Sequence, residues 1–162
     1  IFCTGNPDRK TIAYVINPDK HASLSSGYDF KTEKSIAKFA DEIEDYTVFV
    51  NSAFVAPGVQ QRLLHTCYSR WMQKDIKGHI VNIGTTLENT NDDSDYNQSK
   101  QKLRKQSLQL SDTTGISGVK TTYVVLGGIG PDMCDIEHIG SAIRWIVEQP
   151  FRIPIIQIES VK

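Results

Sequence analysis

Short apolar runs recur along this chain of 162 residues, and segments with helical periodicity separate them. The runs at 47–53, 78–86 and 119–128 combine valine, isoleucine and threonine, a composition typical of strands that are buried on both faces. Between the first two runs, residues 59–73 repeat apolar side chains at the spacing of one helix face. Buried strands that alternate with amphipathic helices favour a parallel sheet covered by helices on both sides. The sequence therefore predicts an α/β fold, a doubly wound parallel sheet of about six or seven strands, in a single domain over residues 1–162.

The remaining segments continue this alternation. The expected elements are a strand at 1–3, a short helix within 9–17, a strand within 21–26, a helix over 32–46 that Thr32 begins, a helix that begins near Asp95 or Tyr96, a helix marked by Ile136, Ile139, Ile143, Ile146 and Val147, and a strand at 153–159. Strands and helices thus alternate along most of the chain.

Charge and hydropathy indicate which classes of binding partner the protein does not favour. The 18 basic and 19 acidic side chains nearly cancel, so no broad field favours nucleic acid or an anionic membrane. No apolar run approaches the roughly 20 residues of a membrane span. Two charged runs are typical of solvated surfaces: a basic helix face of Lys100, Lys102, Arg104 and Lys105, and an acidic loop of Glu88, Asp92, Asp93 and Asp95. The acidic loop could instead form a rim that favours cationic or polar substrates.

The cysteines and histidines do not suggest a metal centre. Cys3, Cys67 and Cys134 are odd in number and widely spaced, which favours buried free thiols in a reducing compartment, hence a cytoplasmic protein. No Cys-x-x-Cys pair and no histidine pair at ligand spacing is present in the sequence. We therefore expect no dedicated metal site.

Tyr96 and Lys100 form the first candidate catalytic pair. Side chains four positions apart are neighbours on a helix, and an ammonium near a phenol favours the phenolate and lowers its pKa. Such a phenol can exchange a proton with a substrate oxygen near neutral pH. Thr85 ends the preceding strand, eleven residues before Tyr96, so its hydroxyl could bind the same oxygen. In a chain with many lysines the spacing alone is a weak signal.

Other small or polar residues also follow predicted strands. Thr4-Gly5, Asn51-Ser52-Ala53, Thr85 and Leu126-Gly127 all lie at such positions. Because the carboxyl ends of parallel strands meet at one sheet edge, and ligands of these folds bind there, we expect one site to contain them. Backbone N–H groups at Thr4-Gly5 could meet a pyrophosphate.

At this point the chain resembles the short-chain dehydrogenase/reductase family, over nearly its whole length and in order. "FCTGN" is similar to the Thr-Gly turn after the first strand, "GYDF" to the segment with the adenine-contacting Asp, and "VNSAF" to Asn-Asn-Ala-Gly. "HIVNIGTT" resembles the strand that delivers the catalytic Ser, "YNQSK" matches Tyr-x-x-x-Lys, and "GVKTTYVVLGG" resembles the strand that ends in Pro-Gly. The resemblance implies a Rossmann-type, three-layer α/β/α fold.

The resemblance also implies a function and its residues. It implies an NAD(P)-dependent oxidoreductase acting on a carbonyl or alcohol of a small-molecule substrate, with NAD or NADP as cofactor. Tyr96 is then the acid/base, Lys100 lowers its pKa and binds the nicotinamide ribose, and Thr85 orients the carbonyl. The implied cofactor-binding residues are Thr4, Gly5, Asn6, Arg9, Asp29, Asn51, Ala53, Lys100 and Gly127. Members pair through helices corresponding to 59–73 and 96–110, where Tyr68 and Trp71 look exposed, so a homodimer or homotetramer is expected. Trp71 is either an interface aromatic or an anchor of its helix to the core.

The chain departs from the family pattern at several positions. Arg9 and Thr11 stand where glycines of the first turn belong, and Phe54 replaces the last glycine of Asn-Asn-Ala-Gly. No asparagine occupies the position of the proton relay, where Gln60 or Gln61 could stand in. The short connection from Gly5 to Asp29 implies that a helix and a strand are shortened or missing, and the short connection after Gly127 implies an open site.

These departures keep other functions open. A nucleotide-binding or regulatory module that has lost turnover is the main alternative. Epimerase or dehydratase chemistry on a nucleotide sugar uses a similar Thr, Tyr and Lys set, although the chain looks too short for the sugar-binding domain. A protein-interaction role remains if no cofactor binds.

Overall fold

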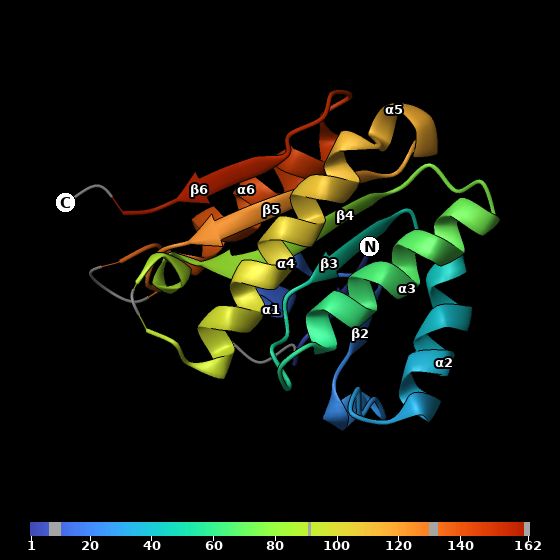
Figure 1. The fold of residues 1–162 in the computed structure, drawn as a ribbon, viewed down its shortest axis with the longest axis horizontal. Coiled ribbons are helices and arrows are strands. Elements are labelled where there is room, and N and C mark those ends of the chain that lie inside the picture. Colours follow the sequence, from blue (N-terminus) through green and yellow to red (C-terminus); the bar gives the residue numbers. More distant parts are fainter. Residues whose placement is uncertain (7–10, 91, 130–132, 161–162) are drawn as a thin grey trace.

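The computed structural model describes residues 1–6, 11–90, 92–129 and 133–160. Within these residues the chain forms one parallel sheet in the order β2-β1-β3-β4-β5-β6. The six described strands are β1 (Phe2–Thr4), β2 (Lys20–Ala22), β3 (Val48–Asn51), β4 (His79–Thr85), β5 (Lys120–Leu126) and β6 (Ile155–Ile158). The strand order reverses between β1 and β3, the doubly wound topology that the sequence predicts (Figure 1).

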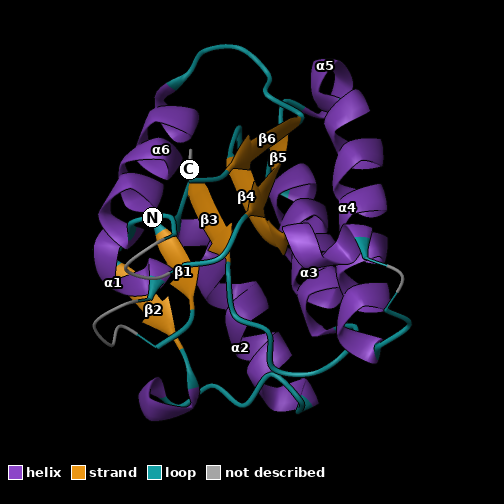
Figure 2. Cartoon of the chain, turned by 90° about the vertical axis from the view of Figure 1, so that its left-hand side faces the viewer, coloured by secondary structure: helices purple, strands orange, loops and turns teal. Residues whose placement is uncertain are grey.

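Helices cover both faces of the sheet. They are α1 (Ile12–Ile16), α2 (Glu33–Glu42), α3 (Val59–Gln73), α4 (Asp95–Asp112), α5 (Thr114–Ser117) and α6 (Ile136–Glu148), with 3-10 turns η1 (Leu24–Ser26), η2 (Ile43–Asp45) and η3 (Thr86–Asn89). Helices α1 and α6 lie on one side of the sheet, and α2, α3 and α4 lie on the other (Figure 2). The predicted Rossmann-type three-layer α/β/α arrangement is confirmed.

Local side-chain bonds set where the helices begin. The Thr32 side chain accepts from the Ser35 N–H at the start of α2, as the sequence predicts. The Ser94 side chain accepts from the Asn97 N–H at 3.3 Å, so α4 begins at Asp95. This start places Tyr96 in the first turn of α4, next to the end of β4.

The core has one cluster under each helix layer. Phe2, Phe39 and Phe49 belong to an aromatic cluster beneath α2 and α3, where the ring centroids of Phe2 and Phe39 lie 5.4 Å apart. A second, aliphatic cluster lies beneath α1 and α6, and Cys3 and Cys134 belong to it. All three cysteines are buried and free, as predicted.

Of the two roles open for Trp71, the structure supports the core anchor, and the expected exposure of Tyr68 and Trp71 is wrong. Trp71 is fully buried, and its indole N–H donates to the Ile43 carbonyl at 2.9 Å, so it anchors α3 to the core. Tyr68 is half-buried, and its hydroxyl lies 2.7 Å from the Thr113 hydroxyl. Neither ring supplies the exposed aromatic patch on which the expected pairing through α3 and α4 partly depends.

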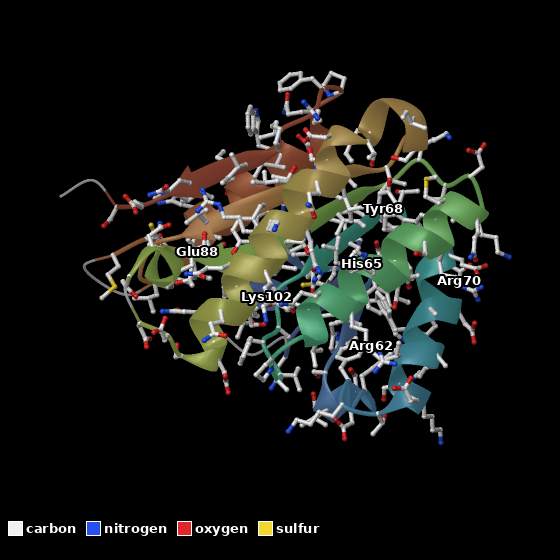
Figure 3. The ribbon with its side chains drawn as sticks, viewed as in Figure 1. Arg62, His65, Tyr68, Arg70, Glu88 and Lys102 are labelled. Carbon is white, nitrogen blue, oxygen red and sulfur yellow. The ribbon has the colours of Figure 1, made fainter. Side chains whose placement is uncertain are left out.

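Two arginines of α3 form ion pairs with α2. Arg62 and Arg70 pair with Glu33 and Asp41 of α2, the latter at 3.0 Å (Figure 3). Exposed ion pairs of this kind contribute little to stability. They nevertheless show that α3 presents polar groups outward beside α2.

The connection between β1 and α2 is short. Among the described residues it holds the five-residue α1, the three-residue β2 and η1, so the helix and the strand expected to be shortened or missing before Asp29 are present and short. No described helix is long and apolar enough to span a membrane.

Candidate active site

The strand ends on one edge of the sheet build the site. Thr4 pairs in register with Ala22 of β2 and Asn51 of β3, and Asn51 pairs with Asn82 of β4. Strand β4 runs three residues beyond Asn82, so Thr85 lies past the ends of β1 to β3. The predicted strand-end residues therefore share one edge.

A cavity of about 270 Å³ lies beyond the ends of β1, β2 and β3. Its walls are largely apolar, and hydroxyl and amide groups line one part. The lining residues are Gly5, Asn6, Ala22, Ser23, Leu24, Ser25, Tyr28, Phe30, Ala53 and Val55. Three of the predicted cofactor-binding residues, Gly5, Asn6 and Ala53, therefore contribute to one cavity.

Thr4 fixes the turn after β3. Its hydroxyl accepts from the N–H groups of Ser52 and Ala53 at 3.0 and 3.2 Å. The hydroxyl also lies 3.4 Å from the Val50 carbonyl, to which it donates. Because Thr4 is fully buried, it acts on the wall of the cavity through Ala53 rather than facing the cavity.

Gly5 turns the chain sharply after β1. Its φ of 131° is a conformation that side chains rarely adopt, and a Cβ there would lie 3.2 Å from the Ser52 hydroxyl. The Gly5 N–H donates to the Ala22 carbonyl at 3.0 Å. This N–H is therefore already used within the protein, whereas the sequence predicts that it meets a pyrophosphate. Arg9, the other residue predicted at this turn, lies outside the described residues.

Asn51 is buried and bonded within the protein. Its amide donates to the Gln60 carbonyl at 2.8 Å and to the Asn82 side chain at 2.9 Å. Gln60 returns a bond from its side-chain NH₂ to the Asn51 carbonyl at 2.8 Å. The Asn51 side-chain oxygen is buried and has no hydrogen-bond partner among the described residues. Asn51 thus holds the start of α3 against β3 and β4.

Lys100 is almost fully buried, which contradicts the solvated basic face expected of its run. Its ammonium donates to the Gln60 side-chain oxygen at 2.7 Å and to the Ile83 carbonyl at 2.8 Å. Burial lowers the pKa of Lys100 to about 8, and the charge of Glu88 opposes this shift. Of the two glutamines that could replace the missing asparagine, Gln60 contacts the lysine, whereas Gln61 bonds Ser99.

Tyr96 lies between Thr85, Phe54 and Lys100. Its ring packs edge-on against Phe54 with centroids 4.8 Å apart, and the Lys100 nitrogen lies 5.5 Å from the Tyr96 ring centroid. Burial raises the pKa of Tyr96, the bond with the Thr85 side chain lowers it, and the charge of Glu88 raises it. The expected lowering below 10 is therefore absent in this structure, because burial opposes the phenolate and the ammonium donates to Gln60 and Ile83.

Asp29 and Gly127 lie at the margins of the site. The Asp29 carboxylate accepts from the Lys31 N–H at 3.1 Å. It lines a separate hollow of about 320 Å³, together with Lys34 and Lys38. Gly127 follows β5, and its N–H donates to the Ile158 carbonyl at 2.9 Å. The structure thus places neither residue in the wall of the cavity beyond β1 to β3.

The sequence does not reveal the role of Glu88. It places Glu88 in an acidic loop typical of a solvated surface, yet the side chain (labelled in Figure 3) is only 1% exposed and pairs with Arg104 at 3.0 Å. Tyr123 of β5 also bonds this carboxylate. The partners lie 16 and 35 positions away, and no local pattern marks them. Among the described residues no group of three His, Cys, Asp or Glu side chains is placed to hold a metal ion.

Comparisons with known proteins show the fold. The structure is similar to a metagenomic short-chain oxidoreductase in complex with NADP, with a TM-score of 0.76, 15% identity, and coverage of 97% of this chain and 94% of that one. It is also similar to serine dehydrogenase from Escherichia coli, with a TM-score of 0.71, 13% identity, and coverage of 98% and 96%. A 4-hydroxyisoleucine dehydrogenase complexed with NADH and succinate gives a TM-score of 0.70, 16% identity, and coverage of 97% of each chain.

No protein-family model and no curated protein sequence matches the chain. At such low identities the structural likeness establishes the architecture, a Rossmann-type α/β fold with its strand-end edge. The function of this edge has to be argued from the residues of this chain.

Proposed function

We propose that this protein is an NAD(P)-dependent oxidoreductase of the short-chain dehydrogenase/reductase type that acts on a carbonyl or alcohol. The observation that carries the proposal is the convergence of Tyr96, Lys100 and Thr85 from two elements. The Thr85 side chain acts to lower the pKa of Tyr96, and the Lys100 ammonium lies 5.5 Å from the Tyr96 ring. Similar structures are described with NADP or NADH.

In this proposal the cavity holds the base and ribose of a dinucleotide. It lies at the topological switch point, and Tyr28, Phe30 and Val55 give it apolar walls suited to an aromatic base. Ser25 and Asn6 offer polar groups in the same cavity. Lys100, Thr85 and Tyr96 would then hold the reacting half. The nicotinamide, when bound, supplies or accepts the hydride.

The chain's own residues supply the proton chemistry. In the reducing direction the Tyr96 hydroxyl donates its proton to the substrate oxygen, and the Thr85 hydroxyl donates a hydrogen bond to the same oxygen. The Lys100 ammonium stabilises the phenolate that remains. Gln60 accepts a hydrogen bond from this ammonium, and in this proposal it stands in for the missing relay asparagine.

A nucleotide-binding module without turnover is the second candidate. The raised pKa of Tyr96 favours it, and so does the Phe54 ring packed at 4.8 Å against Tyr96. The Gly5 N–H is already bonded to Ala22. In this case the protein binds NAD(P) but reduces no carbonyl. The proposal also includes a cytoplasmic location, a single domain and assembly as a homodimer or homotetramer. It includes no nucleic acid or membrane partner.

Titration with NADH and NADPH, followed by nicotinamide fluorescence, tests cofactor binding. Ala53→Leu places bulk in the cavity and is expected to weaken binding at least about tenfold, because the base loses space. Ala40→Leu adds the same bulk in the groove between α2 and α3 and should leave affinity unchanged. Absence of binding by either cofactor contradicts both candidates, and binding without turnover over a carbonyl panel favours the second.

A further inference from the structure

A buried acid lies directly behind the proposed catalytic residues. Glu88 belongs to η3, which begins at the residue after Thr85, and its side chain is only 1% exposed. One carboxylate oxygen accepts from Arg104 of α4 at 3.0 Å, and the other accepts from the Tyr123 hydroxyl of β5 at 2.5 Å. The carboxylate therefore joins three elements at the carboxyl end of β4.

The same network reaches the backbone of Lys100. The Tyr123 hydroxyl also lies 3.2 Å from the Lys100 carbonyl. From the next residue, the Gln101 side chain donates to the Glu88 carbonyl at 2.8 Å. Glu88 is thus tied to the turn of α4 that carries Lys100 through its side chain and through its main chain.

The end of β4 is shaped to admit Tyr123. A Cβ on Gly84 would lie 2.1 Å from the Tyr123 hydroxyl oxygen, so only glycine allows this ring to reach Glu88. Gly84 immediately precedes Thr85. The Tyr123–Glu88 contact therefore requires a glycine at the residue before Thr85.

The charge of Glu88 acts on Lys100. Both acceptors of the Lys100 ammonium, the Gln60 amide of α3 and the Ile83 carbonyl of β4, are neutral. Glu88 supplies the opposing negative charge that favours the ammonium against its burial. The other titratable groups in this interior are Tyr96 and Arg104 of α4 and Tyr123 of β5.

We propose that Glu88 is a positioning residue, whose buried carboxylate locks the end of β4 to the Lys100 turn and sustains the charge of the Lys100 ammonium. Glu88 acts through Lys100 and Tyr123. The inference rests on the proposed roles of Thr85, Tyr96 and Lys100.

Titration of lysine labelled with ¹³C at Cε, observed by NMR in the protein without cofactor, tests this role. Lys100→Met identifies the Lys100 signal. Glu88→Gln keeps the shape and removes the charge, so the Lys100 midpoint is expected to fall by at least about half a pH unit. Glu44→Gln removes a carboxylate that pairs with Arg70 far from this site and should leave the midpoint unchanged. An unchanged midpoint in folded Glu88→Gln overturns the proposal.

A second pair of variants tests the charge if Glu88→Gln does not fold. Arg104→Gln removes the cation that neutralises Glu88, and Lys105→Gln removes the neighbouring exposed cation. The proposal expects the Lys100 midpoint to rise further in Arg104→Gln than in Lys105→Gln, because only the first leaves Glu88 uncompensated. Equal shifts overturn it.

These titrations need no turnover. If Glu88→Gln shifts the Lys100 midpoint while the wild-type protein reduces no carbonyl, the effect of Glu88 on Lys100 stands and the enzyme proposal fails. If Tyr96→Phe abolishes turnover but the Lys100 midpoint is the same in Glu88→Gln as in the wild type, the inference fails and the enzyme proposal stands.

Discussion

The ammonium nitrogen of Lys100 lies 2.7 Å from the side-chain oxygen of Gln60, deep between α3 and α4. The contact joins the α3 helix start, which Asn51 also holds, to the α4 turn that carries the proposed acid/base. Removing this acceptor leaves a buried cation with one fewer partner.

Gln60→Met is therefore expected to destabilise the protein by about 1–3 kcal/mol. The free energy of unfolding in urea measures this. Gln73→Met changes an exposed glutamine at the end of the same helix and should stay within about 0.5 kcal/mol of the wild type. Equal effects of the two substitutions would show that the Lys100–Gln60 bond contributes nothing particular.

Lys100 gives stability a specific alkaline dependence. Its pKa in the folded protein is lowered to about 8 from 10.5 by burial, so between these values the unfolded chain binds more protons. Stability attributable to this residue therefore rises with pH in that window, by about 1.4 kcal/mol per pH unit. The unfolding free energy of the wild type should therefore rise relative to that of Lys100→Met from pH 8 to 10. A constant difference would contradict a lowered pKa.

His79 gives a dependence of the same origin at acid pH. Burial first, and then the charge of Lys120, lower its pKa to about 4, and its ring bonds Thr122 at 2.8 Å. Stability is then complete above pH 6.5 and is lost as the pH falls toward 4, by about 1.4 kcal/mol per unit, since the unfolded chain takes up the proton first. His79→Gln should flatten this loss in acid unfolding curves, and His65→Gln, at an exposed position, should not.

Gly84 tests the close approach that orients Tyr123. Gly84→Ala places a methyl group on the Tyr123 ring, so thermal unfolding should reveal a loss of about 1–3 kcal/mol. Adding Tyr123→Ala removes the clash, and the double variant should lose less than the sum of the two single changes. Gly115→Ala meets open space and should be neutral or slightly stabilising. Strict additivity at Gly84 and Tyr123 would rule out the contact.

The layout of the fold could be predicted because each element carries its own signal. Residues 59–73 form α3 over the predicted range, and Thr32 begins α2 as expected. The site was predicted less completely. That Thr85, Tyr96 and Lys100 lie at one sheet edge could be predicted, because the periodicity of helices and strands implies a parallel sheet whose strands end at that edge.

Burial is what the local patterns did not reveal. The sequence marks Lys100 and Glu88 as parts of charged, solvated runs, yet both are buried because each has a partner from a distant element. Gln60 comes from 40 positions away and Tyr123 from 35. The pKa of Tyr96 depends on the same packing, so its rise could not be read from the spacing to Lys100.

Turnover of Tyr96→Phe is the most direct test of the enzyme proposal. In a preparation that binds NADH or NADPH and oxidises it with a carbonyl substrate, removing this hydroxyl should lower kcat at least about 100-fold while cofactor affinity is retained. Tyr14→Phe, which removes an exposed phenol on α1, should keep the wild-type rate. A Tyr96→Phe protein that turns over as fast as the wild type would contradict the assignment of Tyr96 as the proton donor.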